Sequence, residues 1–351
     1  MSNNYKFHST GQFRNVIKNI QTSAQYKGQD DEGNAIIDST ATAPTLKYTG
    51  TVKLHGTNGS WVLDEYGLSF HSKNNLLGYY NTDGFVLNSD NSEFAQSMSR
   101  RVESVKVVLA RIKALFGTGY NTIKVSGEWC GAGIQKGVGI SFLPKKSFFI
   151  FGVKLDDDWV PVRLLEGIAD GCEDVGIYSI MDFPSFEVDI NFNNPQDIQN
   201  HLIECTELVE ELCPVSHYLK TKDADGVAQT LGEGIVWTPY DYSYSKDSGN
   251  WFKTKGEKHS ISKVKTLAPI DTEKMNSIQE FVEYAVTENR LAQGVQEVGG
   301  VDNKLIGAFL SWISKDINKE EGDVLEDNNL TMKDVGKGVS TKARTWYMNQ
   351  L

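Results

Sequence analysis

Short runs in which apolar and polar residues alternate occupy much of the chain up to about residue 254, and they restrict the folds that it can adopt. The first three runs lie between Leu46 and Ser72, where LKYTGTVKL, SWVLD and LSFHS follow one another. Alternation with a period of two is typical of strands that bury one face of a sheet. Turn-forming residues occur between the runs, at Asn58-Gly59 and at Glu65-Tyr66-Gly67. The segment therefore predicts strands joined by tight turns.

Helical and strand patterns are distributed unevenly along the rest of the chain. Further strands are predicted at residues 124–128, 148–155, 233–238 and 251–254. Helices are predicted at residues 94–116 and 195–212, and then at residues 272–291, 302–316 and 341–351. Strand patterns stop after Pro269. The change indicates two domains with different architectures.

We therefore predict an α+β fold over residues 1–265, followed by a small all-α C-terminal domain over residues 266–351. Residues 1–45 form an N-terminal extension to which the sequence assigns no role. Within and just after it, residues 22–46 are polar and rich in Gly, Ser, Thr and Asp, which predicts a loop or a weakly ordered insertion.

The formal charge of −11 excludes a protein that coats nucleic acid through a uniformly basic surface. Charge is nevertheless segregated along the chain. Residues 100–146 carry nine Lys and Arg against two acidic residues, and residues 246–265 carry six Lys against two. Residues 156–211 carry fifteen acidic residues and one Arg. This segregation predicts a bounded basic groove on an otherwise acidic body.

Cysteine and histidine usage limits the chemistry that can be expected. The four cysteines form no Cys-x-x-Cys pair, so we expect reduced thiols. The six histidines show no zinc-site spacing, which argues against a dedicated transition-metal site. No apolar run approaches the ~18 residues of a membrane helix, and MSNNYKFHST lacks the apolar stretch of a signal peptide. A cytoplasmic protein without a membrane partner is the expectation.

Lys53 lies at the end of a predicted strand in KLHGTNGS. A lysine beside the flexible backbone of Gly56 can reach a ligand phosphate, and its amine is a nucleophile once it is unprotonated. His55 is two residues further on and would share its face in a strand. Taken alone, the pattern also fits an exposed lysine near a hairpin.

Three further segments carry candidate ligand-binding residues. Glu128 lies in SGEWCGAGIQKGVG, where a carboxylate at a strand end can accept hydrogen bonds from sugar hydroxyls. These glycines match neither the dinucleotide fingerprint nor the P-loop. The run FFIF ends at Phe151, and its rings either fill the core or stack on a nucleobase. Glu233 lies between glycines in GEGIVW, a setting that suits a hydrated Mg²⁺.

Lys253 and Lys255 in WFKTKGEK complete the set. Residues two apart on a strand point the same way, so the two ammonium groups could form a phosphate clamp or a solvated edge. Aimed at the pocket that contains Lys53, they would also favour its unprotonated amine through like-charge repulsion.

In this order the segments resemble the motif set of the covalent nucleotidyltransferases, which include ligases and capping enzymes. KLHGTN is similar to the nucleophile motif of RNA ligases, because DNA ligases and capping enzymes usually carry Asp at the position of His55. GEWCGAGIQKGV is similar to the corresponding stretch of the bacteriophage double-strand RNA ligases of the RNA ligase 2 type. YAVTENRLAQGVQEVGG and DNKLIGAFLSWISKDI resemble the helical C-terminal domain of that family. The resemblance covers about residues 45–350.

The resemblance implies a role for each matching residue. Lys53 would be the nucleophile that attacks ATP, with His55, Glu233, Lys253 and Lys255 as further catalytic residues. The nucleotide would be bound by Lys53, Leu54, Asn58, Lys73, Glu128, Phe151, Glu233, Lys253 and Lys255. Glu128 would bind the ribose, Phe151 would stack on adenine and Glu233 would hold the metal. Lys73 stands where the family has an arginine, so the charge is kept but the bidentate fork is lost.

The implied fold is a nucleotidyltransferase domain of antiparallel sheets with flanking helices. The implied activity is ATP- and Mg²⁺-dependent sealing of RNA ends, with RNA in duplex or bridged form as the partner. A monomer in the cytoplasm of the host cell is expected if the chain is phage-encoded. A DNA ligase and a capping guanylyltransferase are the enzymatic alternatives, and His55 argues against both. A non-catalytic nucleic-acid-binding protein on the same scaffold is the alternative of another class.

Overall fold

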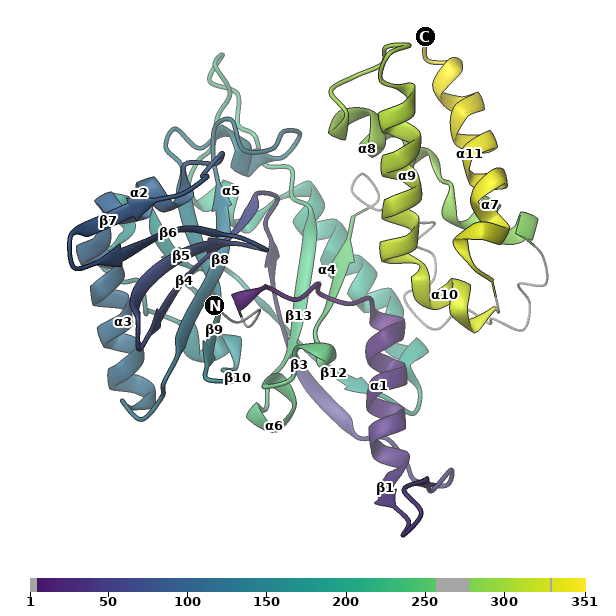
Figure 1. Ribbon diagram of the computed structural model, residues 1–351, viewed down its shortest axis with the longest axis horizontal. Helices are drawn as coiled ribbons and strands as arrows, with labels where there is room; N and C mark the ends of the chain where they lie inside the picture. The colour runs from purple at the N-terminus through teal and green to yellow at the C-terminus, as the bar shows by residue number, and fades with distance from the viewer. Residues whose placement is uncertain (1–4, 257–277, 329) are drawn as a thin grey trace. The chain divides into compact units, whose positions relative to one another are not determined.

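The computed structural model describes residues 5–256, 278–328 and 330–351 and contains two compact units (Figure 1). One unit comprises Met1–Thr254 and combines sheets with flanking helices, and the other comprises Lys255–Leu351. The described elements from Ile278 onward are all helices. The α+β fold and the helical C-terminal region are therefore confirmed. The predicted boundary at residues 265 and 266 lies outside the described residues.

The larger sheet of the first unit has eight strands. Seven of them follow one another in the spatial order β10 (Asp158–Trp159), β9 (Ser147–Leu155), β8 (Ile123–Cys130), β4 (Thr57–Asp64), β5 (Gly67–Ser72), β6 (Leu76–Asn81) and β7 (Gly84–Leu87). These neighbours are antiparallel, whereas β11 (Ile177–Ser179) pairs in parallel with β9. Helix α2 (Phe94–Arg100) packs against β5, β6 and β7. The Phe94 ring centroid lies 5.1 Å from that of Phe148 and 5.7 Å from that of Trp129, which fixes α2 on the sheet.

The smaller sheet has four strands in the order β12 (Phe186–Asn191), β3 (Thr45–Lys53), β13 (Gly234–Pro239) and β14 (Phe252–Lys255). Helix α4 (Gln199–Glu211) packs against β13. Helix α1 (Phe13–Gln25) inserts Phe13 into the core, where its ring centroid lies 4.7 Å from that of Phe252. Burial alternates on the outer strands β12 and β14, whereas the central strands β3 and β13 are buried over most of their length.

The first unit contains further helices and strands. They are β1 (Tyr26–Gln29), β2 (Ala35–Ile37), α3 (Val102–Phe116), α5 (Pro214–Tyr218) and α6 (Tyr242–Ser245). Single 3₁₀ turns lie at Gly139–Phe142, Val162–Leu165, Glu173–Val175, Ile180–Asp182, Pro195–Ile198 and Ser248–Asn250.

The prediction of a loop over residues 22–46 is wrong for most of that segment. Its first four residues end α1, and the hairpin of β1 and β2 follows. The helix forms because Phe13, Val16, Ile17 and Ile20 recur at helical spacing and are all buried. The polar residues at its C-terminal end obscure that spacing when the segment is read by composition.

Two other local predictions also need correction. The helix predicted over residues 94–116 is two helices, because Arg101 leaves the helical conformation at φ −107° and ψ 20°. Its guanidinium donates to the Lys146 carbonyl oxygen (3.1 Å) and lies over the Trp129 ring, contacts with residues distant in sequence. Asn58-Gly59 is not a turn but part of β4, since pairing with β8 extends the strand through both residues.

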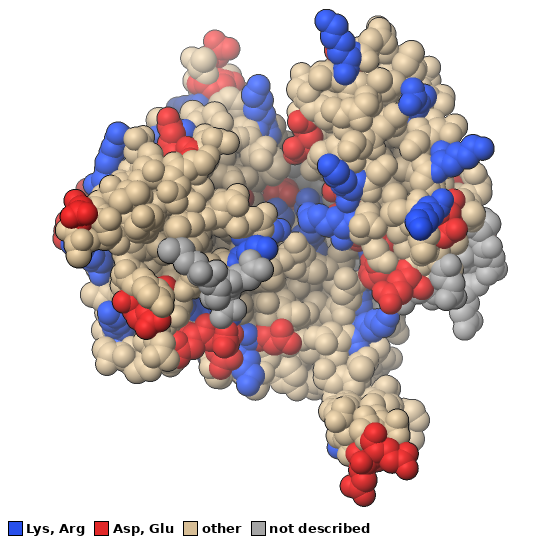
Figure 2. Space-filling model, viewed as in Figure 1, with Lys and Arg blue, Asp and Glu red and all other residues tan. Residues whose placement is uncertain are grey.

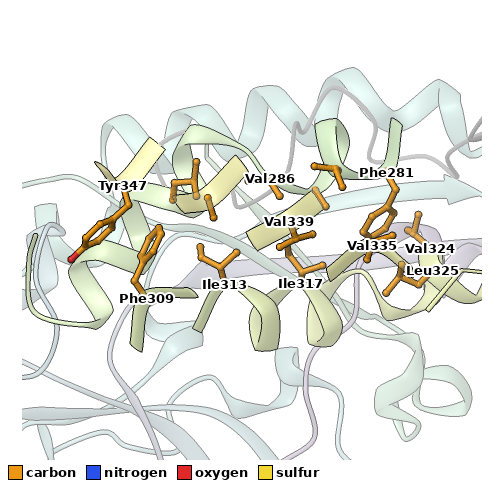
Figure 3. Packing of buried hydrophobic residues seen from close by; sticks show 14 residues of the cluster. Phe281, Val286, Phe309, Ile313, Ile317, Val324, Leu325, Val335, Val339 and Tyr347 are labelled. Carbon is orange, nitrogen blue, oxygen red and sulfur yellow. The ribbon is translucent and has the colours of Figure 1, made fainter. Parts of the chain in front are cut away.

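The second unit consists of α7 (Ile278–Ala285), α8 (Glu288–Glu297), α9 (Ile306–Glu320), α10 (Gly322–Asp327) and α11 (Met332–Met348). Its core is a cluster of buried apolar side chains (Figure 3). Phe309, Ile313 and Ile317 repeat every four residues on α9 and face the cluster, and the Phe309 and Tyr347 ring centroids are 4.5 Å apart. The helices predicted at residues 302–316 and 341–351 correspond to α9 and to the end of α11. The helix predicted at residues 272–291 corresponds to α7 and the start of α8, with residues 272–277 outside the described part.

A buried charged group lies beside this core. Arg290 has no exposed surface, and it donates to Asp316 Oδ2 (2.9 Å), to Glu321 Oε1 (3.0 Å) and to the Ala285 carbonyl oxygen. Tyr284 Oη donates to the other oxygen of Glu321 at 2.9 Å. The guanidinium therefore joins α8 to α9 and to the residue that precedes α10.

Arg290→Met is expected to lower the free energy of unfolding of this unit by ~3–5 kcal/mol, because the carboxylate of Glu321 stays buried without its cation. A urea titration of the full chain, followed by hydrogen exchange of α9 amides, measures this loss. Lys342→Met is the matched control, since Lys342 pairs with Glu283 at a more exposed site and should change the same quantity by ~0–1 kcal/mol. Equal stabilities of the two variants would show that the Arg290 group is dispensable.

Within the described residues, no helix is both long and apolar enough to cross a membrane.

Candidate active site

Two neighbouring strands of the smaller sheet bring Lys53 and Glu233 together. β3 ends at Lys53, and the antiparallel register pairs this residue with Gly234, the first residue of β13. Glu233 precedes Gly234 and therefore lies beside the lysine. Lys53 Nζ donates a hydrogen bond of 2.6 Å to Glu233 Oε2. The Glu233 side chain is 3% exposed and that of Lys53 is 22% exposed, so the ion pair is largely shielded from water but the amine remains accessible.

The turn after β3 adds two groups to this pair. His55 Nδ1 lies 3.3 Å from Glu233 Oε2, so both side chains meet the same carboxylate oxygen. The Gly56 N–H donates to Glu128 Oε1 at 2.9 Å, which ties the turn to β8. A Cβ at position 56 would lie 2.4 Å from the Trp129 carbonyl oxygen, so only glycine fits this approach.

Glu128 and Asn58 occupy opposite positions in the register of β8 and β4. Directly opposed residues of an antiparallel pair point to the same face, so both side chains reach the same space. Burial raises the pKa of Glu128 to about 7, and the nearby ammonium of Lys53 partly opposes this shift. The carboxylate therefore titrates close to neutral pH.

A β-bulge on β9 decides which residue of FFIF reaches the ligand side. Ser126 pairs with Gly152 and Gly127 pairs with Ile150, which leaves Phe151 as the extra residue. Phe148, Phe149 and Ile150 have no exposed surface, whereas Phe151 is partly exposed. Phe151 is thus the ring of this run that a planar ligand can reach most readily.

A cavity of about 120 Å³ opens beside these residues. Five of the predicted site residues line it: Lys53, Leu54, Asn58, Glu128 and Phe151. Nine others also line it: Phe7, Thr10, Thr51, Val52, Phe149, Ile180, Val236, Thr238 and Trp251. Most of this lining is apolar, with a few polar groups, as is usual for small-molecule sites.

Two polar atoms of this lining are buried without a hydrogen-bond partner, namely Asn58 Oδ1 and Thr238 Oγ1. A buried polar group without a partner costs ~1–3 kcal/mol, and a bound ligand can supply the missing bond. Thr238 was not singled out by the sequence. It directly follows the GEGIVW segment on β13, and only the cavity shows that its side chain faces the site.

The other predicted residues are not part of the cavity lining. Glu233 and His55 contact Lys53 or its partner as described above. Lys73 follows β5, and its Nζ donates to Ser9 Oγ at 3.0 Å. Lys253 and Lys255 alternate on β14, and the Lys253 N–H donates to the Gly11 carbonyl oxygen at 3.1 Å.

The candidate site offers few side chains that could bind a metal ion directly. Among the described residues no three His, Cys, Asp or Glu side chains come together as a metal cage. Glu233 is the buried carboxylate that contacts Lys53, and a single carboxylate is compatible with Mg²⁺, which retains water and substrate oxygens as ligands.

All four cysteines are buried free thiols, and burial raises the pKa of Cys130 well above its usual range.

The basic segment at residues 100–146 does not contribute all its charge to the surface. Lys124 is 3% exposed and donates to the Tyr5 carbonyl oxygen at 2.6 Å. Arg111 donates to the carbonyl oxygens of Ile168 and Asp170. Lys and Arg side chains are spread over the visible face, and an acidic group lies at the tip of the β1–β2 hairpin (Figure 2). The basic groove stays a prediction, and fewer Lys and Arg side chains of this segment can contribute to it than the nine counted in the sequence.

Comparison with protein families identifies this arrangement. The family model described as RNA ligase matches residues 46–255, which contain all the predicted site residues. The chain belongs to the RNA ligase family. The match begins at β3 and ends at the last residue of β14, so helix α1 and the helical unit lie outside it.

Solved structures give a more distant likeness for this RNA ligase family member. One is a lysine-to-alanine mutant of Naegleria gruberi RNA ligase with ATP and Mn, at 13% identity and a TM-score of 0.44, covering 73% of this chain and 57% of that one. Another is the same ligase with PPi, at 15% identity and a TM-score of 0.42, covering 71% and 56%. The chain thus spans a little over half the length of these proteins. A search of curated proteins finds no match.

Proposed function

We propose that this chain is an ATP-dependent RNA ligase that joins a 5′-phosphate end to a 3′-hydroxyl end through a lysyl–AMP intermediate on Lys53. The observation that carries the proposal is the pairing of Lys53 with the buried Glu233 beside a cavity lined by Glu128 and Phe151. Membership of the RNA ligase family supports the same chemistry. The domain that performs the first step is residues 1–265, and the helical domain that follows contributes to sealing.

In the first step, the Lys53 amine attacks the α-phosphorus of ATP. A phosphorus–nitrogen bond forms, the bond to the bridging oxygen of pyrophosphate breaks, and pyrophosphate leaves. The amine must lose a proton to attack, and Glu233 Oε2 already accepts a hydrogen bond from it at 2.6 Å. AMP then passes from Lys53 to the RNA 5′-phosphate, and the 3′-hydroxyl of the other end displaces AMP.

Different residues of the candidate site bind the ribose, the base and the phosphates of the nucleotide. The ribose hydroxyls donate to Glu128, the adenine ring stacks on Phe151, and the unpartnered Asn58 Oδ1 accepts a further hydrogen bond. Leu54 contributes apolar surface. Lys73, Lys253 and Lys255 neutralise the phosphates, because cations near a transferring phosphoryl group stabilise its charge. Glu233 would hold Mg²⁺, which offsets the charge of the reacting phosphates when bound.

The preferred substrate is a nick in duplex RNA, on the basis of the GEWCGAGIQKGV segment and of His55. Two assays test the whole proposal. The first offers α-labelled ATP, GTP or labelled NAD⁺ with Mg²⁺ and scores label on the protein, which we expect from ATP alone. Label from GTP would favour a capping enzyme. The second compares sealing of nicked duplexes that carry RNA or DNA on each side of the nick, and of a single strand. Equal sealing of an all-DNA nick would contradict the RNA assignment.

The pKa of Glu128 makes nucleotide affinity depend on pH. Because burial raises this pKa to about 7, the carboxylate is mostly protonated at pH 6 and mostly ionised at pH 8. Only the ionised form accepts hydrogen bonds at both oxygens, so ATP should bind about tenfold more tightly at pH 8 than at pH 6. Titration calorimetry over this range measures the change.

Glu128→Gln is the control for this pH dependence. It keeps the size of the side chain but cannot titrate, so its affinity should follow only the ionisation of the nucleotide itself. That ionisation is common to both proteins and cancels in the ratio of their affinities. A ratio that stays constant between pH 6 and pH 8 would refute the assignment of Glu128 to the ribose.

A further inference from the structure

The N-terminal extension contains a segment that lies against the cavity, although the family match does not include it. Residues 5–11, here called the N-terminal strap, run from the start of the described chain towards α1 (Figure 1). Two of its residues, Phe7 and Thr10, line the cavity together with Lys53, Glu128 and Phe151. The strap is therefore part of the cavity wall.

Hydrogen bonds hold the strap against the larger sheet at its N-terminal end. Tyr5 Oη donates to Asp64 Oδ2 at 2.7 Å, and the Tyr5 carbonyl oxygen accepts a bond of 2.6 Å from the buried Lys124. The Phe7 N–H donates to the Lys73 carbonyl oxygen at 3.1 Å. These bonds involve β4, β8 and Lys73, the residue that follows β5.

The C-terminal end of the strap is held by the smaller sheet. Gly11 forms a parallel bridge with Phe252, and its carbonyl oxygen accepts from the Lys253 N–H at 3.1 Å. Between the two ends, Ser9 Oγ accepts from Lys73 Nζ at 3.0 Å. The strap thus joins the two sheets that carry the candidate active site, and it contacts two of the predicted phosphate ligands, Lys73 and Lys253.

The geometry of Phe7 defines what it can contact. Its ring centroid lies 5.3 Å from that of Phe151, with an angle of 69° between the ring planes. Trp159 supports Phe7 from another side, at 5.6 Å and 78°. A base that stacks on Phe151 lies nearly parallel to that ring, so it meets Phe7 at a steep angle, which is the favourable edge-to-face arrangement.

We propose that the N-terminal strap forms one wall of the nucleotide pocket and that Phe7 contacts the nucleobase directly, beside Phe151. This inference rests on the proposed function. It assigns a role to part of the N-terminal extension. The ligand is the adenine nucleotide of the proposed function, and the apolar corner formed by the two aromatic rings accommodates its flat heterocycle.

Phe7→Ala tests the proposal through the dependence of lysyl–AMP formation on ATP concentration. The KM for ATP should rise about tenfold, and the rate at saturating ATP should stay within about twofold of wild type, because the lost contact binds the base and not the reacting phosphate. Phe7→Tyr keeps the ring and should restore the wild-type KM. Tyr26→Ala removes a half-exposed aromatic side chain of β1 outside the cavity and should change neither value.

Hydrogen exchange of the wild-type protein provides a second test that does not depend on the folding of a variant. Saturating ATP should slow exchange at the amides of residues 5–11, including the Phe7 N–H. An unchanged KM in a folded Phe7→Ala protein, or unchanged strap exchange while the amides of β8 become protected, would overturn this inference alone. Failure of the wild-type protein to form lysyl–AMP would overturn the proposed function and this inference with it.

Discussion

Lys53→Ala is expected to abolish the transfer of label from α-labelled ATP to the protein. The amine of Lys53 supplies the nitrogen of the phosphoramidate bond, and alanine offers no nucleophile in its place. Glu233, which receives a hydrogen bond of 2.6 Å from this amine, stays in the variant as a buried carboxylate without it. The loss should therefore be complete within detection, and denaturing gel analysis of the labelled protein measures it.

Two further variants make this result specific. Lys53→Arg keeps a positive charge next to Glu233 but carries a guanidinium that stays protonated, so it should also form no adenylate. Lys47→Ala lies on the same strand, where Lys47 pairs with the exposed Glu187, and it should label like wild type. Acid-labile adenylate that persists on Lys53→Ala would show that another residue is the nucleophile.

Glu233→Gln is expected to slow adenylation by a factor of ~10²–10³, because it removes the charge that faces the amine and, in the proposed function, the metal. The amide keeps the size of the side chain, so its 3% exposed position should remain filled. His55 Nδ1 lies 3.3 Å from the same oxygen, so its contact with a carboxylate is removed as well. Single-turnover kinetics at saturating ATP and Mg²⁺ measure the rate.

Glu187→Gln is the matched control for this substitution. Glu187 on β12 pairs with Lys47, and its side chain is 53% exposed, so the same chemical change there should leave adenylation unaltered. Thermal unfolding of both variants separates a catalytic effect from a loss of structure. A wild-type rate in folded Glu233→Gln would remove Glu233 from the proposed chemistry.

The candidate site residues were predicted from short segments whose order resembles the nucleotidyltransferase motif set, and the two that form the ion pair lie at strand ends. Lys53 ends β3 and Glu233 precedes β13, and the alternating patterns indicate both strands without reference to tertiary contacts. The patterns do not contain the register that brings Lys53 beside Glu233, 180 positions away in the sequence. Local periodicity carries no information about which strands become neighbours.

Local patterns failed where a distant contact determined the backbone or the use of a side chain. Arg101 interrupts the predicted helix where its side chain reaches Lys146 and Trp129. Asn58 is in β4 and not in a turn because β8 pairs with it. The role of Phe7 depends on Phe151, which lies more than a hundred residues away in the chain.

The sequence by itself determined the strand and helix content, the change to an all-helical C-terminal region and the chemical types of residue at the site. Those features depend on periodicity and on side-chain chemistry, which are local. Only the tertiary structure decided that the bulge at Phe151 exposes that ring, and that Glu233 and His55 share one oxygen. It alone placed the N-terminal strap in the cavity wall, because strand register and long-range packing are set by burial of the whole core.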